Sequence, residues 1–148
     1  MHNNNSNNDF AFIHIRPGIE SKEHPLATIA ISTISEDDFL STSSRFAIGF
    51  AAQHVKKDRQ WNAAMGRNVA RGRAEKSAKR IYVHADRGVG RRDLMTAAVV
   101  RVLEAVEAGE LFATKKATRA LQDTLTRFAA AKFDSENRYF ANEDLAAE

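Results

Sequence analysis

A turn rich in glycine and arginine stands between a predicted strand and a predicted helix, and its residue types suit the binding of a phosphate. The turn consists of Arg87, Gly88, Val89, Gly90, Arg91 and Arg92. Glycines let a backbone expose its N–H groups, a helix N-terminus attracts anions, and arginine can donate two hydrogen bonds to one phosphate. The third glycine of a dinucleotide-binding motif is replaced by Asp93, and the lysine of a P-loop is missing. The turn therefore predicts a phosphate contact, with a surface turn and solvated arginines as the alternative.

The segment before this turn is a basic helix that could follow a phosphate backbone. Its predicted phosphate contacts are Arg59, Arg67, Arg71, Arg73, Lys76 and Arg80. Binding of this kind weakens steeply as salt rises. The same pattern also fits a solvated helix face, and Gly66 and Gly72 weaken the helix by about 1 kcal/mol each relative to alanine. Glycine could instead allow close packing, with Gly72 under the sheet. We expect the arginines between Trp61 and Asp93 to gather on one outward surface.

Two ring side chains could add a stacking platform for unpaired bases. Tyr82 and His84 alternate with the apolar Ile81 and Val83, so they share one face of a predicted strand. Rings on a strand can stack on bases of a single-stranded nucleic acid. The exposed face of an edge strand is the other interpretation of the same pattern.

Histidines and carboxylates give no clear metal site. His14, His54 and His84 fall in or just after strands that could be neighbours, but no two have the spacing of a recognised ligand pair, and the chain has no cysteine. We therefore expect no bound metal and no cofactor.

A catalytic site is not indicated either. Asp37 and Asp38 are adjacent, so on a strand they point to opposite faces, and a nuclease site would need Asp86 as a third carboxylate. No serine lies in a nucleophile elbow. We expect no catalytic residue and a non-enzymatic protein. A small hydrolase acting on a nucleotide would need a phosphate and a divalent ion bound between Asp86 and Arg92.

Apolar and β-branched runs bounded by turn residues predict four strands. They cover residues 10–16, 26–34, 45–52 and 81–85. In the third run, large apolar side chains alternate with Ala47, Gly49 and Ala51. The large face belongs to the core, and the small face could admit a closely packed helix.

Three helices complete the prediction, and their ends carry recognisable signals. They run from about Asp58 to Arg73, from Asp93 to Ala108 and from Thr114 to about Phe133, with Asp58 and Asp93 as caps and Gly109 as the residue after the second helix. The inward stripes are predicted to be Trp61, Met65, Val69 and Gly72; then Met95, Val99, Val102, Leu103 and Val106; then Leu121, Leu125 and Phe128.

The element order β-β-β-α-β-α-α predicts an α+β fold. We expect a four-stranded, mainly antiparallel sheet with three helices, in which the β-α-β crossover adds one strand in parallel and the helices cover a face. One domain spans residues 10–136, between an Asn-rich tail at 1–9 and an acidic tail at 137–148. The alanine-rich faces around Ala120 and Ala129 to Ala131 could form a core or the seam of a homodimer.

Charge is distributed unevenly along the 148 residues. Residues 56–101 hold 13 basic and 4 acidic residues, a net charge of +9, whereas the rest of the chain carries 9 basic and 15 acidic residues, a net charge of −6. A concentrated positive field attracts phosphates or an acidic protein surface. No apolar run is long enough to cross a membrane, no signal peptide is evident, and the lack of cysteine suits a reducing cytoplasm.

One segment resembles a pattern in small, uncharacterised proteins encoded by phages. The pattern is a strand, Phe46 to Ala51, followed by Lys57-Asp58-Arg59 and then by the helix motif that runs from Gly66-Arg67 to Gly72-Arg73. The resemblance covers about residues 45–75, and the aromatic residue, Trp61, does not directly follow Lys-Asp-Arg as it does in the pattern. It implies a phage accessory protein that works in the cytoplasm of the bacterial host.

The sequence thus predicts a phage-type accessory protein that binds DNA or RNA through the basic helix and the Gly-Arg turn. The alternative is a protein-binding inhibitor or modulator of a host nuclease, polymerase or defence complex, with its basic face docked on an acidic host protein. In both cases the partner is not a membrane, and the C-terminal helices could join two copies of the chain.

Overall fold

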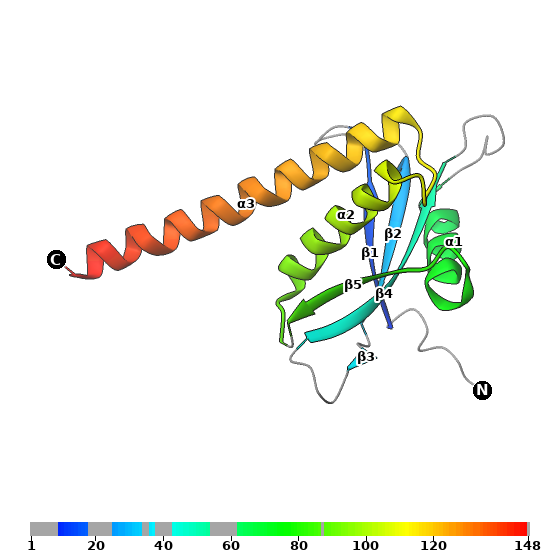
Figure 1. Cartoon of the computed structure of the whole chain (residues 1–148). Helices are drawn as coiled ribbons and strands as arrows, with labels where there is room; N and C mark the ends of the chain where they lie inside the picture. The colour runs from blue at the N-terminus through cyan, green and yellow to red at the C-terminus, as the bar shows by residue number, and fades with distance from the viewer. Residues whose placement is uncertain are drawn as a thin grey trace.

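The computed structural model describes residues 9–17, 25–33, 36–37, 43–53, 62–86 and 88–147, with side chains as far as Asp134. Its elements are β1 (Phe10–Ile15), β2 (Ala27–Ser32), β3 (Glu36–Asp37), β4 (Ser43–Ala52), α1 (Ala63–Lys76), β5 (Ile81–Asp86), α2 (Arg91–Glu107) and α3 (Lys115–Ala147) (Figure 1). The α+β class and the order of the main elements are confirmed, with β3 as a short additional strand. Arg59, Trp61, Arg87, His54 and the first eight residues lie outside the described part.

The sheet has the order β1-β2-β4-β5, and the short β3 pairs with the first part of β4 beside β2. Every pairing is antiparallel, including β4 with β5, so the expected parallel strand is wrong. The reason is the path of α1. Its last turns lie beside the carboxyl end of β4, where Arg73 reaches Phe50 and Ile48 pairs with Ile81. The chain therefore enters β5 at the end where β4 finished and must run back along it.

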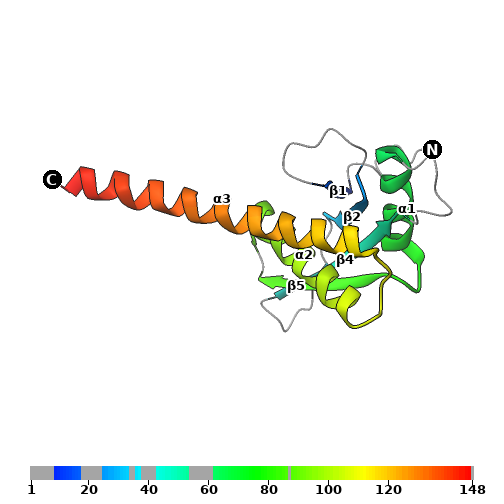
Figure 2. The same ribbon diagram turned by 90° about the horizontal axis from the view of Figure 1, so that it is seen from above.

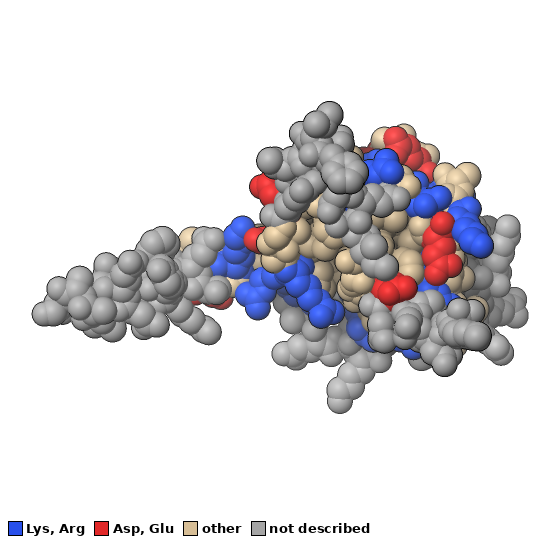
Figure 3. Space-filling view, turned by 90° about the horizontal axis from the view of Figure 1, so that it is seen from below, with Lys and Arg blue, Asp and Glu red and all other residues tan. Residues whose placement is uncertain are grey.

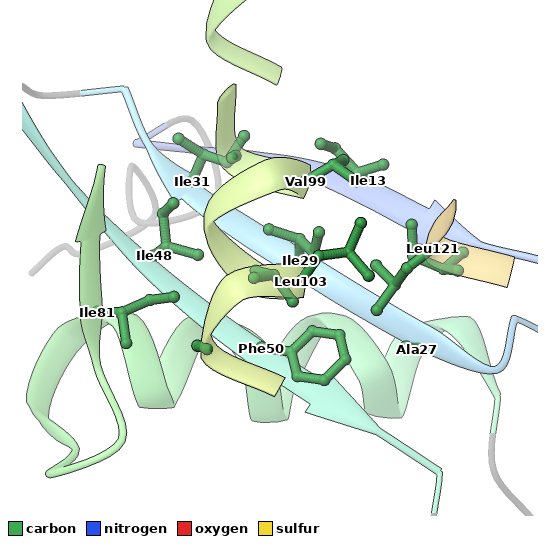
Figure 4. Packing of buried hydrophobic residues seen from close by; sticks show 14 of the residues in the cluster. Ile13, Ala27, Ile29, Ile31, Ile48, Phe50, Ile81, Val99, Leu103 and Leu121 are labelled. Carbon is green, nitrogen blue, oxygen red and sulfur yellow. The ribbon is translucent and has the colours of Figure 1, made fainter. Parts of the chain in front are cut away.

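Helices lie on both faces of the sheet, rather than on one as expected. Figures 1 and 2 show α1 on one side and α2 with the first part of α3 on the other. The main core lies between the sheet and α2 and α3. Its largest members are Ile15, Ile29, Ile31, Ile48, Phe50, Val99, Val102 and Leu121, all fully buried (Figure 4). Alternate residues of each strand point into this layer, as the period of two predicts.

The opposite face of the sheet carries small side chains, and α1 lies directly on it. Ala30, Ala51 and Ala70 form its buried centre. A Cβ added to Gly49 would meet the carbonyl oxygen of Ala70 and would lie 2.5 Å from the backbone nitrogen of Ala74. The prediction that the small face of the 45–52 strand admits a closely packed helix is thus confirmed.

The start and the inward stripe of α1 differ from the prediction. The helix begins at Ala63, and its N-cap is Asn62, whose Oδ1 accepts a hydrogen bond from the Met65 N–H at 2.9 Å, so Asp58 is not the cap. Its buried stripe is Gly66, Ala70 and Ala74, whereas Met65 and Gly72 are exposed. Gly72 has open space around it and does not lie under the sheet. The helix lies too close to the sheet for large side chains at the centre of the contact, where glycine and alanine are buried, and Val69, Phe10 and Phe12 pack around them.

The predicted limits of α2 and α3 are partly correct. Gly90, not Asp93, is the N-cap of α2, and Asp93 lies in its first turn. Gly109 adopts a φ of +77° after the end of α2, a conformation that glycine reaches without strain. The helix α3 begins next to Thr114, where the start was expected, and Thr114 Oγ1 accepts a hydrogen bond from the Ala117 N–H at 3.1 Å. The backbone of α3 continues to Ala147 rather than ending near Phe133.

The second half of α3 projects away from the rest of the chain (Figures 1 and 2). Its first half packs through Ala117, Ala120, Leu121 and Thr124, which are buried, so the alanine at 120 belongs to the core. Ala129, Ala130 and Ala131 are exposed. Among the described helices, none has a stretch apolar enough to cross a membrane.

Candidate polyanion-binding surface

The basic residues at α1 and its junction with β5 form the first of two groups of predicted contacts. Residues 62–80 carry six basic side chains and one carboxylate, that of Glu75. We call the six the α1 basic group: Arg67, Arg71, Arg73, Lys76, Lys79 and Arg80. Arg67, Lys76 and Lys79 are exposed, and the others are half-buried. The group therefore presents a positive field to solvent on the α1 side of the sheet.

Arg73 has a structural role within this group. Its Nη1 donates a hydrogen bond of 2.8 Å to the backbone carbonyl of Phe50. The partner strand β5 pairs only as far as Ile48, so no other described strand pairs with this edge of β4 at Phe50. Arg73 satisfies a carbonyl that the sheet leaves unpaired. From the sequence, Arg73 was predicted only to contact phosphate.

Arg16, which directly follows β1, is a cation that the sequence analysis missed, and it acts on His14. Burial lowers the pKa of His14 below its ordinary 6.5, and the charges of Arg16 and Arg67 lower it further. His14 Nδ1 and the buried Thr28 Oγ1 are hydrogen-bonded at 3.1 Å. Because α1 also contacts β1, Arg67 on α1 and Arg16 after β1 belong to one positive region around His14. No spacing in the sequence could reveal this, because 53 positions separate His14 from Arg67.

The ring of Tyr82 is already in contact with arginine. The guanidinium carbon of Arg45 lies 4.1 Å from the ring centroid, and that of Arg80 lies 5.7 Å from it. Both distances are within the range of a cation–π interaction. Tyr82 and His84 share a face of β5, as predicted, and His84 is exposed. A base that stacked on Tyr82 would have to share the ring with these cations.

Beside β5 lies a pocket of about 590 Å³ on the edge of the sheet. Its charged and polar lining is Lys79, Arg80, Tyr82, His84, Arg101 and Glu110. Arg101 covers part of the edge of β5, because its Nε donates a hydrogen bond of 3.1 Å to the Tyr82 carbonyl. Its Nη2 lies 3.8 Å from Glu110 Oε2. Arg101 thus blocks a backbone acceptor that another strand could have used.

The Gly-Arg turn forms the second group, at the N-terminus of α2. Gly88 has a φ of +79°, and Gly90 provides no side-chain cap, so the first N–H groups of α2 have no side-chain acceptor from the N-cap. Arg91 and Arg92 are exposed there. They line a groove of about 450 Å³ with Met95, Phe128 and Ala131.

The two groups do not form one surface. The α1 basic group lies on one side of the sheet, whereas Arg91 and Arg92 lie beside α3 on the other. Figure 3 shows basic side chains gathered where α3 leaves the body, and others on the opposite part of the body with carboxylates among them. The expected single surface is therefore wrong, because β5 carries the chain from one side of the fold to the other.

Comparisons of the chain with protein-family models, with curated proteins and with solved structures found no match. Among the described residues, no three histidine or acidic side chains come together as metal ligands. The ion pairs of Arg101 with Glu110 and of Lys132 with Asp93, the latter at 3.3 Å, use basic residues other than the predicted contacts.

Proposed function

We propose that the protein is a non-enzymatic accessory protein of the phage type that binds a polyanion, first of all a nucleic acid. The α1 basic group is the binding surface, and Arg16 and Arg45 extend it across the sheet. The proposal depends on one observation above all: six basic residues and one acidic residue in 62–80 on one side of the fold. Phosphates would meet several exposed cations there, as non-specific nucleic-acid binding requires.

The chemistry of this surface favours backbone contacts over base recognition. Arginine and lysine contact phosphates and set position, but they carry no base information in this role. The ring of Tyr82 is shared with Arg45 and Arg80. We therefore expect binding to DNA and RNA with little sequence preference and a strong dependence on salt. A cytoplasmic location in a bacterial host and a homodimer joined through the C-terminal helices belong to the same proposal.

Reversing two exposed charges should test the surface directly. In Arg67→Glu/Lys76→Glu, affinity for labelled DNA or RNA should fall at least about tenfold at moderate salt, and the plot of log affinity against log salt should be less steep by about 2. Fluorescence anisotropy at several salt concentrations measures both. Lys115→Glu/Lys116→Glu is the control, since both lysines are exposed on α3 and the net charge changes equally.

Equal losses in the two variants would contradict the proposal, because net charge alone would then explain binding. Absence of binding by the unchanged protein at low salt would also contradict it. That result would favour the alternative of a protein-binding modulator of a host nuclease, polymerase or defence complex.

His14 supplies an independent signal of binding. Phosphates near Arg16 and Arg67 would offset the charges that lower its pKa, so that pKa should rise when a nucleic acid is added. NMR titration of the His14 ring with and without an oligonucleotide measures the change. In Arg67→Gln the pKa of His14 without nucleic acid should already lie closer to 6.5, and the rise caused by the oligonucleotide should be smaller. An unchanged His14 pKa in a saturated complex would place the nucleic acid elsewhere.

The same shift has a consequence for stability. The folded pKa of His14 lies below its unfolded value, so the unfolded chain takes up the proton first as the pH falls. The contribution of His14 to stability is therefore present above about pH 6.5. It is lost as the pH falls from there through the lowered pKa of His14 in the folded state.

A further inference from the structure

Beyond Lys132, whose Nζ lies 3.3 Å from Asp93 Oδ1, α3 projects from the rest of the fold (Figures 1 and 2). From Ala129 to Asp134 all side chains are exposed, and the backbone remains helical to Ala147. An isolated helix of this length is only marginally stable in water. Its persistence as a single helix therefore calls for a surface that packs against it.

A groove with an apolar floor and a cationic rim lies at the base of this projection. Met95, Phe128 and Ala131 provide the apolar lining, and Arg91 and Arg92 provide the charge. A second pocket of about 540 Å³ continues it towards the end of the sheet and shares Arg91 and Met95 with it. A ligand for this groove would combine apolar groups with negative charge.

The last part of α3 has that chemistry. Residues 134–148 contain five carboxylates and one basic residue, Arg138, together with Tyr139, Phe140 and Leu145. A segment of the same chain cannot reach the groove, because the helix leads straight away from it (Figures 1 and 2). A second copy can bring its own segment there.

Helical periodicity places the contact on one face of α3. The core side contains Leu121, Thr124 and Phe128, and positions 135, 139 and 142 continue that stripe at three- and four-residue steps. Phe133, which is 62% exposed, lies on the opposite side of the helix. The stripe is self-complementary in an antiparallel pair, because a two-fold axis between Phe133 and Asp134 brings position 128 of one copy to position 139 of the other.

We infer that two copies pair antiparallel along α3, so that the C-terminal segment of each occupies the groove beside the other's α2 N-terminus. Phe128 then packs against Tyr139 of the other copy, and the carboxylates of its segment face Arg91 and Arg92. The anion at the Gly-Arg turn is in this arrangement a carboxylate of the partner copy rather than a phosphate. A two-fold pair uses the same patch on both copies and closes without forming a filament.

This inference rests on the homodimer of the proposed function and specifies how the copies meet. It leaves the α1 basic group free on the other side of the sheet. Each dimer would thus present two polyanion-binding surfaces, and linked binding sites raise the overall affinity for a long polyanion.

Charge reversal with a complementary partner tests the contact in the full-length chain. Arg91→Glu/Arg92→Glu should weaken dimerisation at least about tenfold in sedimentation equilibrium. Glu136→Lys/Glu143→Lys should do the same. Mixing the two variants should restore a dimer, because each groove then meets a segment of opposite charge. Circular dichroism checks that each variant is folded, and Phe133→Ala, on the far side of α3, should dimerise like the unchanged protein.

Cross-linking locates the register. The chain has no cysteine, so Phe128→Cys/Tyr139→Cys introduces one pair. These positions are about 16 Å apart along one helix, too far for an internal disulfide, but should meet across the dimer. Oxidation should therefore give a covalent dimer, whereas Thr126→Cys/Ala141→Cys, on the far face, should not. A monomer at all concentrations would overturn the homodimer itself. A dimer that forms equally well in Arg91→Glu/Arg92→Glu and does not cross-link through positions 128 and 139 would overturn the antiparallel arrangement but not the homodimer.

Discussion

Replacing Gly49 by alanine should lower the free energy of unfolding by about 3 kcal/mol or more, since backbone atoms leave no space for the added carbon. The new Cβ would meet the carbonyl oxygen of Ala70 and lie 2.5 Å from the nitrogen of Ala74. These are atoms of the α1 backbone, so no side chain can rotate away. The whole of α1 would have to move off the sheet. Urea denaturation followed by circular dichroism, at a fixed protein concentration, measures the loss.

Gly72→Ala is the matched control for this change. Gly72 lies in the same helix, has ample space around it and is exposed. Alanine is the better helix former by about 1 kcal/mol, so this variant should be as stable as the unchanged protein or more stable. The two substitutions add the same methyl group and should have effects of opposite sign. A loss of under about 1 kcal/mol in Gly49→Ala would contradict the close packing of α1 on β4.

Phe50→Ala should lower the free energy of unfolding by about 3–5 kcal/mol. Phe50 is 1% exposed and is the largest fully buried side chain of the core between the sheet and α2 (Figure 4). Its removal would leave a cavity among residues of three elements, including Ile29 and Leu103, which cannot collapse without moving the strands. The same urea experiment measures the loss.

Phe112→Ala is the control for this prediction, because Phe112 is 52% exposed. The change should stay within about 0.5–1 kcal/mol of the unchanged protein. Similar losses in the two variants would mean that Phe50 is not at the centre of the core. A large loss in Phe50→Ala with a cooperative transition would support a single core for β1, β2, β4, β5 and α2.

The sequence alone determined the four longer strands, their inward faces and the class of the fold, but not the short β3. Alternation of large and small residues in 45–52 was sufficient to predict which side of β4 enters the core and which receives a helix. Gly109 marked the end of α2, and Thr114 marked the start of α3. These signals are local: they depend on backbone geometry and on the period of two in a strand.

Only the tertiary structure decided the register of α1, the direction of β5 and the grouping of the cations. The buried stripe of α1 is Gly66, Ala70 and Ala74, because the sheet residues beneath it are small and the helix backbone comes close to Gly49. Of the predicted stripe, Met65 and Gly72 are exposed and Val69 is half-buried. Arg67 and Arg16 both lower the pKa of His14 and so lie near it, whereas Arg91 belongs to another side of the fold. The sequence gives the number of basic residues in each segment, but strand pairing and helix packing determine which of them share a surface.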